Sequence, residues 1–178
     1  EINIYLTNPF NNDTDTDGLL DGEEINIYLT NPFNNDTDTD GISDYDEVII
    51  HFSDPNDSDT DSDTMPDGWE IDNLLDPLLN DSALDPDNDM LSNGLEYQYS
   101  TLPFNNDTDT DLLIDGEEVF LYGTNPTLYD TDSDGISDYD EVIIHYTDPL
   151  QEDSDSDGIS DYDEINTHGT DPLNNDTD

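Results

Sequence analysis

Acidic residues recur along this chain at spacings that suit metal coordination. Seven twelve-residue segments follow the pattern Asp-x-Asp-x-Asp-x-x-x-Asp-x-x-Glu with a single substitution among them, and the first runs from Asp13 to Glu24. Hard divalent cations such as calcium take about six to eight oxygen ligands. A twelve-residue loop can supply them from the side chains of positions 1, 3, 5, 9 and 12 and the backbone carbonyl of position 7. The repetition predicts calcium binding, with about one ion in each loop.

We number each loop from position 1 to position 12, so that Asp13 is position 1 of the first loop. The seven loops are 13–24, 36–47, 59–70, 85–96, 107–118, 130–141 and 153–164. The predicted metal ligands, taken loop by loop, are Asp13, Asp15, Asp17, Leu19, Asp21, Glu24, Asp36, Asp38, Asp40, Ile42, Asp44, Glu47, Asp59, Asp61, Asp63, Met65, Asp67, Glu70, Asp85, Asp87, Asp89, Leu91, Asn93, Glu96, Asp107, Asp109, Asp111, Leu113, Asp115, Glu118, Asp130, Asp132, Asp134, Ile136, Asp138, Glu141, Asp153, Asp155, Asp157, Ile159, Asp161 and Glu164.

The loops differ at position 6, where glycine permits the sharp turn that directs the carbonyl of position 7 inward. Four loops carry glycine there, whereas Thr64, Met90 and Leu112 occupy this position in the other three. The fourth loop also has Asn93 in place of the aspartate of position 9. We therefore expect weaker or distorted sites across 59–118, most of all in the fourth loop.

The composition excludes several classes of function. The chain of 178 residues holds 50 acidic residues and no lysine or arginine, which gives a formal net charge of −50. Nucleic acids and anionic membrane surfaces are excluded as direct partners, because contacts to phosphate need basic side chains. The lack of cysteine excludes disulfides and thiol nucleophiles, and no apolar run approaches the ~20 residues of a membrane span. So much like charge is typical of disorder, so folding requires that cations neutralise it.

The loops are parts of a longer repeat. Residues 1–18 recur letter for letter as residues 24–41, and successive loops start 22 to 26 residues apart. This regularity predicts one tandem array cut from a longer chain. Its predicted units are 13–35, 36–58, 59–84, 85–106, 107–129, 130–152 and 153–175, with partial units at 1–12 and 176–178.

Each unit must position its loop with a short apolar segment and a turn. Segments such as 46–53, DEVIIHFS, follow the loops, and an Asn-Pro or Asp-Pro pair ends most of them. The β-branched triplet Val48 to Ile50 could form a strand, but Asp21 or Asp44 as a cap and proline as a stop favour a helix of about two turns. One such helix cannot bury a core alone. We therefore predict a small irregular tandem-repeat array, in which calcium-wrapped loops and short helices stack into an elongated rod with little or no β-sheet.

The loop sequences DTDTDGLLDGEE and DSDGISDYDE, followed by turns such as YLTNP and HGTDP, resemble the calcium-binding thrombospondin type 3-like repeats of microbial surface proteins. The resemblance covers nearly the whole chain, less well over 63–102. It implies an extracellular, calcium-stabilised rod or stalk without catalysis of its own. Dockerin modules have a similar unit, but their loops carry the apolar residue at position 8, whereas here it is at position 7.

Hydroxyl and amide side chains beside the ligands suggest glycan attachment. Serine or threonine occupies most of positions 2 and 4, whose side chains are expected to point into solvent; local hydrogen bonding is the alternative role. Six Asn-Asp-Ser/Thr sequons occur, and in five of them the asparagine lies three residues after the turn proline. The candidates are Asn12, Asn35, Asn56, Asn80, Asn106, Asn175, Thr14, Thr16, Thr37, Thr39, Thr108, Thr110, Thr131, Ser133, Ser154 and Ser156.

The three histidines, His51, His145 and His168, each lie four residues after a loop's final glutamate. A histidine at a helix end interacts favourably with the helix dipole, and three equivalent copies do not single out a catalytic triad. We expect no enzyme. The predicted function is a calcium-dependent structural protein of the cell surface or an extracellular rod, stalk or fibre, with glycans and copies of the same chain as further partners. The alternatives are a dockerin-like docking or adhesion module and an acidic protein that interacts with minerals.

Overall fold

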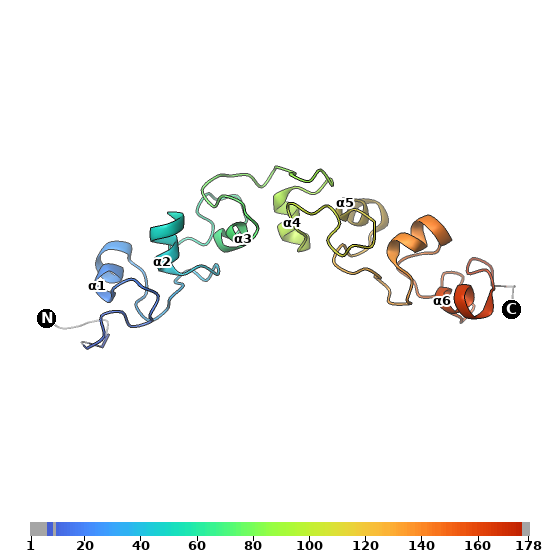
Figure 1. The fold of residues 1–178 in the computed structure, drawn as a ribbon, viewed down its shortest axis with the longest axis horizontal. Helices are drawn as coiled ribbons and strands as arrows, with labels where there is room; N and C mark the ends of the chain where they lie inside the picture. The colour runs from blue at the N-terminus through green and yellow to red at the C-terminus, as the bar shows by residue number, and fades with distance from the viewer. Residues whose placement is uncertain (1–6, 9, 176–178) are drawn as a thin grey trace. The chain divides into compact units, whose positions relative to one another are not determined.

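Short helices and long loops make up the chain, in a computed structural model that describes residues 7–8 and 10–175 (Figure 1). The predicted partial unit 176–178 and residues 1–6 and 9 of the other partial unit lie outside the described residues. The described residues form no strand, and one isolated bridge pairs Leu102 with Asn105. The prediction of an irregular repeat array with little β-sheet is confirmed.

The helices follow the loops in chain order. They are α1 (Asp21–Glu23), η1 (Glu24–Tyr28), α2 (Asp44–Asp46), η2 (Glu47–His51), α3 (Asp67–Asp72), α4 (Asn93–Tyr99), α5 (Asp115–Glu117), η3 (Glu118–Tyr122), η4 (Asp140–His145), α6 (Asp161–Asp163) and η5 (Glu164–His168), where η marks a π-helix. The chain divides into two compact units, Glu1–Ala83 and Leu84–Asp178. We call these the first and the second unit.

Each helix begins at or just after position 9 of its loop, and position 8 is the usual N-cap. In the second loop the Ser43 hydroxyl accepts a hydrogen bond from the Asp46 amide at 3.1 Å. The prediction that Asp21 or Asp44 caps the helix is therefore wrong, since both are the first helical residue. Their carboxylates accept hydrogen bonds from position 2 of the same loop and are not available as caps.

The apolar segment is helical, as predicted, but its turn is wider than an α-helical turn. In η2 the Phe52 amide donates to the carbonyl of Glu47, five residues earlier, at 2.6 Å. Phe52 itself adopts the left-handed conformation that ends the helix, with φ of 64°. Glycine suits this position best, and Gly123 occupies it after η3. The π-helix starts at the position 12 glutamate in four loops and one residue earlier, at Asp140, in the sixth loop, whereas α3 and α4 of the third and fourth loops are α-helices.

Asparagine or aspartate before proline forms the turn that leads to the next loop. The Asn31 carbonyl accepts from the Asn34 amide at 2.9 Å, and its side chain accepts from the Phe33 amide at 3.3 Å. The Asn31 amide in turn donates to the Thr37 hydroxyl at 2.9 Å. Because Thr37 is position 2 of the second loop, the turn fixes where that loop begins.

The apolar core is very small. Among the described residues its buried members are Leu19, Ile42, Met65, Leu91, Leu113 and Ile136, all of them at position 7. Buried acidic side chains outnumber them. Burial of apolar surface is the main favourable term in ordinary folding, so a core of this size leaves much of the stability to the acidic loops.

Neighbouring repeats are joined by the aspartate of position 5. In the first unit the Asp17 carboxylate accepts from the Tyr45 amide, position 10 of the next loop, at 3.2 Å. In the second unit Asp111 accepts from the Tyr139 amide in the same way, at 2.8 Å. None of the helices in the described part of the chain has the length and apolar character that a membrane crossing requires.

Candidate metal centres

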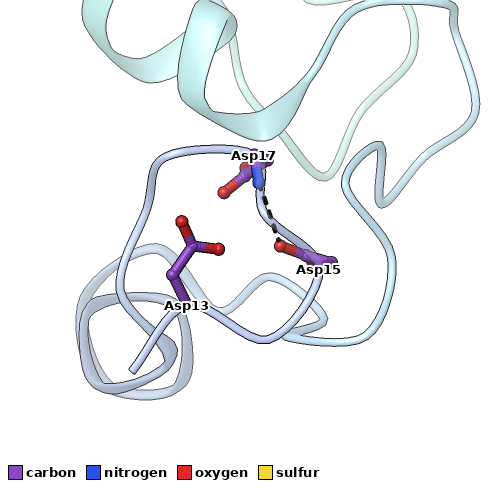
Figure 2. Close-up of side chains that lie close together, drawn as sticks. All are labelled: Asp13, Asp15 and Asp17. Atoms are coloured by element: carbon purple, nitrogen blue, oxygen red, sulfur yellow. Dashed lines mark hydrogen bonds between the residues drawn. The ribbon is translucent and has the colours of Figure 1, made fainter. Parts of the chain in front are cut away.

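The aspartates of positions 1, 3 and 5 converge within a loop. Figure 2 shows Asp13, Asp15 and Asp17 around the inside of the first loop, where one carboxylate oxygen from each lies within 4.8 Å of the others. Equivalent groups form in the second and third loops, at positions 36, 38, 40 and 59, 61, 63. The alternation along an irregular loop therefore brings three predicted ligands together, in the way that a cation requires.

Backbone amides of the loop hold these carboxylates in place. In the second loop Asp36 accepts from the Thr39 amide at 2.7 Å and from the Gly41 amide at 3.1 Å. Asp40 accepts from the Ile42 amide at 2.8 Å. The same hydrogen bond at position 5 also places the position 7 side chain, which packs into the core. Sequence reasoning assigned position 7 only a carbonyl ligand and missed the packing role of its side chain.

The glutamate of position 12 is fully buried in every loop. All seven have no exposed surface, and each has at least one buried carboxylate oxygen without a hydrogen-bond partner; they are Glu24, Glu47, Glu70, Glu96, Glu118, Glu141 and Glu164. In the second loop one oxygen of Glu47 accepts from the Ser53 hydroxyl at 3.2 Å, which leaves the other unpaired. A buried, unpaired carboxylate is strongly unfavourable unless it is neutralised.

Burial and like charge raise the pKa of these acids. Burial first, and then repulsion from the loop aspartates, raises the pKa of Glu70 and Glu118 to about 9 and that of Glu47 to about 8, from an ordinary value of 4.5. Burial and the nearby Asp40 raise the pKa of Asp38 to about 6. A bound cation reverses this effect, because it favours the charged form of every carboxylate around it.

The aspartate of position 9 has contacts in its own loop and also lies close to acids of the preceding loop. In the third loop the Asp67 carboxylate accepts from the Thr60 amide at 2.8 Å and from the Thr60 hydroxyl at 2.6 Å. It also lies beside the second loop, where Asp40, Glu47 and Asp67 each offer an oxygen within 4.8 Å of the others. Position 9 thus brings a carboxylate of one loop to the acids of the preceding loop.

The expectation that position 2 points into solvent is wrong. In six of the seven loops the position 2 hydroxyl donates to the position 9 carboxylate, at 2.6 to 2.9 Å; the donors are Thr14, Thr37, Thr60, Thr108, Thr131 and Ser154. The fourth loop has Pro86 at position 2, which has neither an amide proton nor a hydroxyl. Asn93 therefore stands opposite a residue that could not donate to a carboxylate.

Position 6 keeps one backbone conformation whether or not it is glycine. Gly41 has φ of 105° and Gly135 of 108°, while Thr64, Met90 and Leu112 have φ of 83°, 86° and 93°. The loops without glycine therefore keep the turn at the expense of backbone strain. The expectation of weaker sites in those loops stays a prediction.

The glycosylation candidates differ in exposure. The asparagines of the sequons, Asn12, Asn35, Asn56, Asn80, Asn106 and Asn175, are all exposed. The position 4 candidates, Thr16, Thr39, Thr110, Ser133 and Ser156, are exposed too, whereas the position 2 candidates, Thr14, Thr37, Thr108, Thr131 and Ser154, are half-buried. Position 2 is the poorer site for glycan attachment in the folded chain, because its hydroxyl already donates a hydrogen bond to the carboxylate of position 9.

One acid near the loops was not singled out by sequence reasoning. Asp81 follows α3 in the first unit and lies with Asp63 and Glu70 in a third kind of group, in which all three residues are buried. The only sequence signal is the spacing of 26 residues between the third and fourth loops, the longest in the array. The histidines end π-helices as expected, with His51 as the last residue of η2.

Comparisons with known proteins found local similarity to solved structures and a match to one repeat family. Two solved structures contain similar segments. A biofilm associated protein B domain is 40% identical over 25% of this chain and 11% of that chain, with a TM-score of 0.25. A biofilm associated protein BSP domain is 46% identical over 24% of this chain and 7% of that one, with a TM-score of 0.24. The matches thus span about a tenth of those chains, and no curated protein matches.

The model of the bacterial TSP3 repeat matches residues 13–35, 36–58, 107–128, 130–152 and 153–175. The stretch 59–106, which holds the longest spacing and the loop with Pro86 and Asn93, lies outside the matched residues. Because the matched stretches make up more than half of the sequence, the chain belongs to the bacterial TSP3 repeat family.

Proposed function

We propose that this protein is a calcium-dependent structural repeat protein whose folded state is held together by the ions in its loops. The observation that carries the proposal is the set of seven fully buried glutamates with unpaired oxygens, in a chain without lysine or arginine. The chain has no lysine or arginine to neutralise these acids, so a cation from solution is the natural counter-charge. TSP3 repeats are calcium-binding repeats, which supports the same ion.

The chemistry of the donors favours calcium over other divalent ions. The clusters consist of carboxylates, with no cysteine in the chain to select a soft metal. Magnesium keeps several of its waters and is usually bound through one or two carboxylates. Loops that offer three aspartates and a glutamate match the higher coordination number of calcium. We assign the ligands to the residues predicted above, with about one ion inside each loop.

Calcium removal tests this function directly. We expect the calcium-loaded protein to show helical far-ultraviolet circular dichroism and a chelated sample to lose most of it, because ion binding is coupled to folding. Restoring calcium in excess of the chelator should recover the signal. An unchanged spectrum between chelator and calcium, together with no heat of calcium binding in calorimetry, would refute the proposed function.

We infer further that the protein works on the outside of the cell, as part of a rod, stalk or fibre without catalytic activity. High extracellular calcium suits carboxylate loops of modest affinity, since extracellular calcium modules often have dissociation constants of about 0.1 to 1 mM. Glycans on the exposed asparagines and on position 4 would coat this surface. Intact mass of native material tests the glycan load, and a mass that the amino-acid sequence alone accounts for would exclude the glycans.

A further inference from the structure

Three buried acids of the first unit meet at a place where the repeat pattern is broken. Asp63 is 4% exposed, Glu70 is 0% exposed and Asp81 is 8% exposed, and one carboxylate oxygen of each lies within 4.8 Å of the others. Asp63 and Glu70 are positions 5 and 12 of the third loop. Asp81 belongs to no loop and comes from the segment that follows α3 (Asp67–Asp72).

The glutamate of this group has no partner within the protein. Both carboxylate oxygens of Glu70 are buried without a hydrogen bond, whereas Glu47 has one oxygen bonded to a hydroxyl. Three buried carboxylates at this separation, in a chain without lysine or arginine, repel one another strongly. A divalent cation among them removes the repulsion and satisfies the oxygens of Glu70.

The backbone after α3 is shaped to deliver Asp81 to this place. The second carboxylate oxygen of position 5, Oδ2 of Asp63, accepts from the Asp81 amide at 3.0 Å and from the Ser82 amide at 2.9 Å. At other junctions that oxygen accepts from position 10 of the following loop, as Asp17 does from Tyr45. The segment after α3 therefore takes the place of a following loop.

The neighbouring junction shows which ligand Asp81 replaces. There the group is Asp40, Glu47 and Asp67, so the third carboxylate comes from position 9 of the next loop. For the third loop the next position 9 is Asn93, which is the one position 9 of the array without a carboxylate. Asn93 thus has no carboxylate to offer the third loop, and Asp81 is the third acid of its group instead.

We propose that Asp63, Glu70 and Asp81 bind one divalent cation, calcium under the function proposed above, and that Asp81 is a ligand which the inserted segment supplies in place of position 9. Each residue of this site lies before the boundary at Ala83. The last metal site of the first unit is therefore complete without any residue of the second unit. The first unit thus closes its own series of metal sites.

The full-length chain and three variants test this site. Asp81→Asn removes the charge but keeps the size and the backbone donors, and Asp81→Glu keeps the charge. Asp72→Asn is the matched control, because Asp72 is exposed on α3 and the change in net charge is the same. Native mass spectrometry counts bound calcium. The fluorescence of Trp69, the single tryptophan, reports locally because it directly precedes Glu70.

We expect Asp81→Asn to bind one calcium fewer than wild type, or to shift the Trp69 transition to at least about 10-fold higher calcium, since even outer partners of a metal site typically contribute 10–100-fold. Asp81→Glu should lose less affinity than Asp81→Asn, and Asp72→Asn should match wild type. The site is refuted if Asp81→Asn keeps the wild-type count and transition, or if Asp72→Asn loses as much.

Two further outcomes are distinguishable. If Asp81→Asn does not fold at saturating calcium, Asp81→Glu decides the matter: a folded variant with the wild-type ion count supports the site, and a failure of this variant as well overturns it in favour of a structural role for Asp81. A wild-type chain that binds no calcium at all would instead refute the proposed function and not the assignment of Asp81 alone.

Discussion

The residue at position 4 adopts a strained backbone conformation in every loop, and its type sets the cost of that strain. This residue is left-handed in all seven loops, with φ between 63° and 69°, and it is threonine or serine in six of them. A non-glycine residue in this region is disfavoured by about 1–2 kcal/mol, and a β-branched residue is a rare occupant. Asn88 is the exception in the array, and asparagine tolerates the left-handed conformation best after glycine.

Replacing threonine by asparagine at position 4 should therefore stabilise a loop. We expect Thr39→Asn to raise the free energy of unfolding of the calcium-loaded chain by about 0.5–1 kcal/mol, as the backbone strain at this residue is relieved. The reverse change, Asn88→Thr, should lower it by a similar amount. Urea unfolding at saturating calcium measures both. A destabilised Thr39→Asn variant would show that the threonine side chain contributes more than its backbone strain costs.

At the scale of the element, the sequence predicted what local chemistry decides. Proline after the apolar segment and acids before it identified a helix, and the helix is present. The π-helical width of its last turn was not predictable from sequence. It depends on the hydrogen bond from the Phe52 amide to the Glu47 carbonyl, which local propensities do not specify. The cap was misassigned for a similar reason. Aspartate is a favourable N-cap in general, but the Asp44 carboxylate instead accepts hydrogen bonds from the amide and the hydroxyl of Thr37.

The junction between repeats depends on close approach at position 10. A Cβ atom on Gly68 would lie 2.3 Å from the carbonyl oxygen of Asp40, and one on Gly116 would lie 2.1 Å from that of Asp89. Other junctions place tyrosine there instead, and the Tyr45 ring lies over Gly18. Glycine at position 10 is thus required where the backbones of two loops touch.

We expect Gly68→Ala to destabilise the first unit by about 1–3 kcal/mol, since overpacking against a fixed backbone has costs of this size. Gly22→Ala is the matched control. Gly22 is also position 10 of its loop, and a Cβ atom there meets nothing within 4 Å. This control should be neutral or slightly stabilising, because alanine favours a helix. Thermal unfolding followed by circular dichroism compares them, and equal melting temperatures would contradict the contact between the loops.

For the whole molecule, the metal ligands that repeat with the loops were predictable from the sequence, whereas Asp81, which belongs to no loop, was not. Positions 1, 3, 5 and 12 repeat with a fixed spacing, so that one loop predicts the others. Asp81 has no such pattern around it, and only the three-dimensional position of Asp63 and Glu70 identifies it. The roles of position 9 likewise depend on contacts between consecutive loops, which a local motif does not describe.

The pKa values of the buried glutamates predict opposite effects of pH on the metal-free and the calcium-bound chain. In the metal-free fold, burial and neighbouring aspartates raise the pKa of Glu24 to about 7, of Glu47 to about 8 and of Glu118 to about 9, above the ordinary 4.5. The folded state therefore binds more protons than the unfolded state between these values. The stability that these glutamates contribute is fully present below about pH 4.5 and is lost as the pH rises through about 7 to 9.

Calcium competes with protons for the same carboxylates. The affinity for calcium should therefore rise with pH over the range in which the metal-free fold is lost. We expect dialysed, metal-free protein to lose helical circular dichroism between about pH 5 and pH 9, and the calcium concentration at half-saturation to fall over that range. Calcium titrations at several pH values, with magnesium as the control cation, measure how both the helical signal of the metal-free chain and the half-saturating calcium concentration change with pH. If the metal-free chain gained structure as the pH rose, the buried glutamates would not be the groups that oppose folding without calcium.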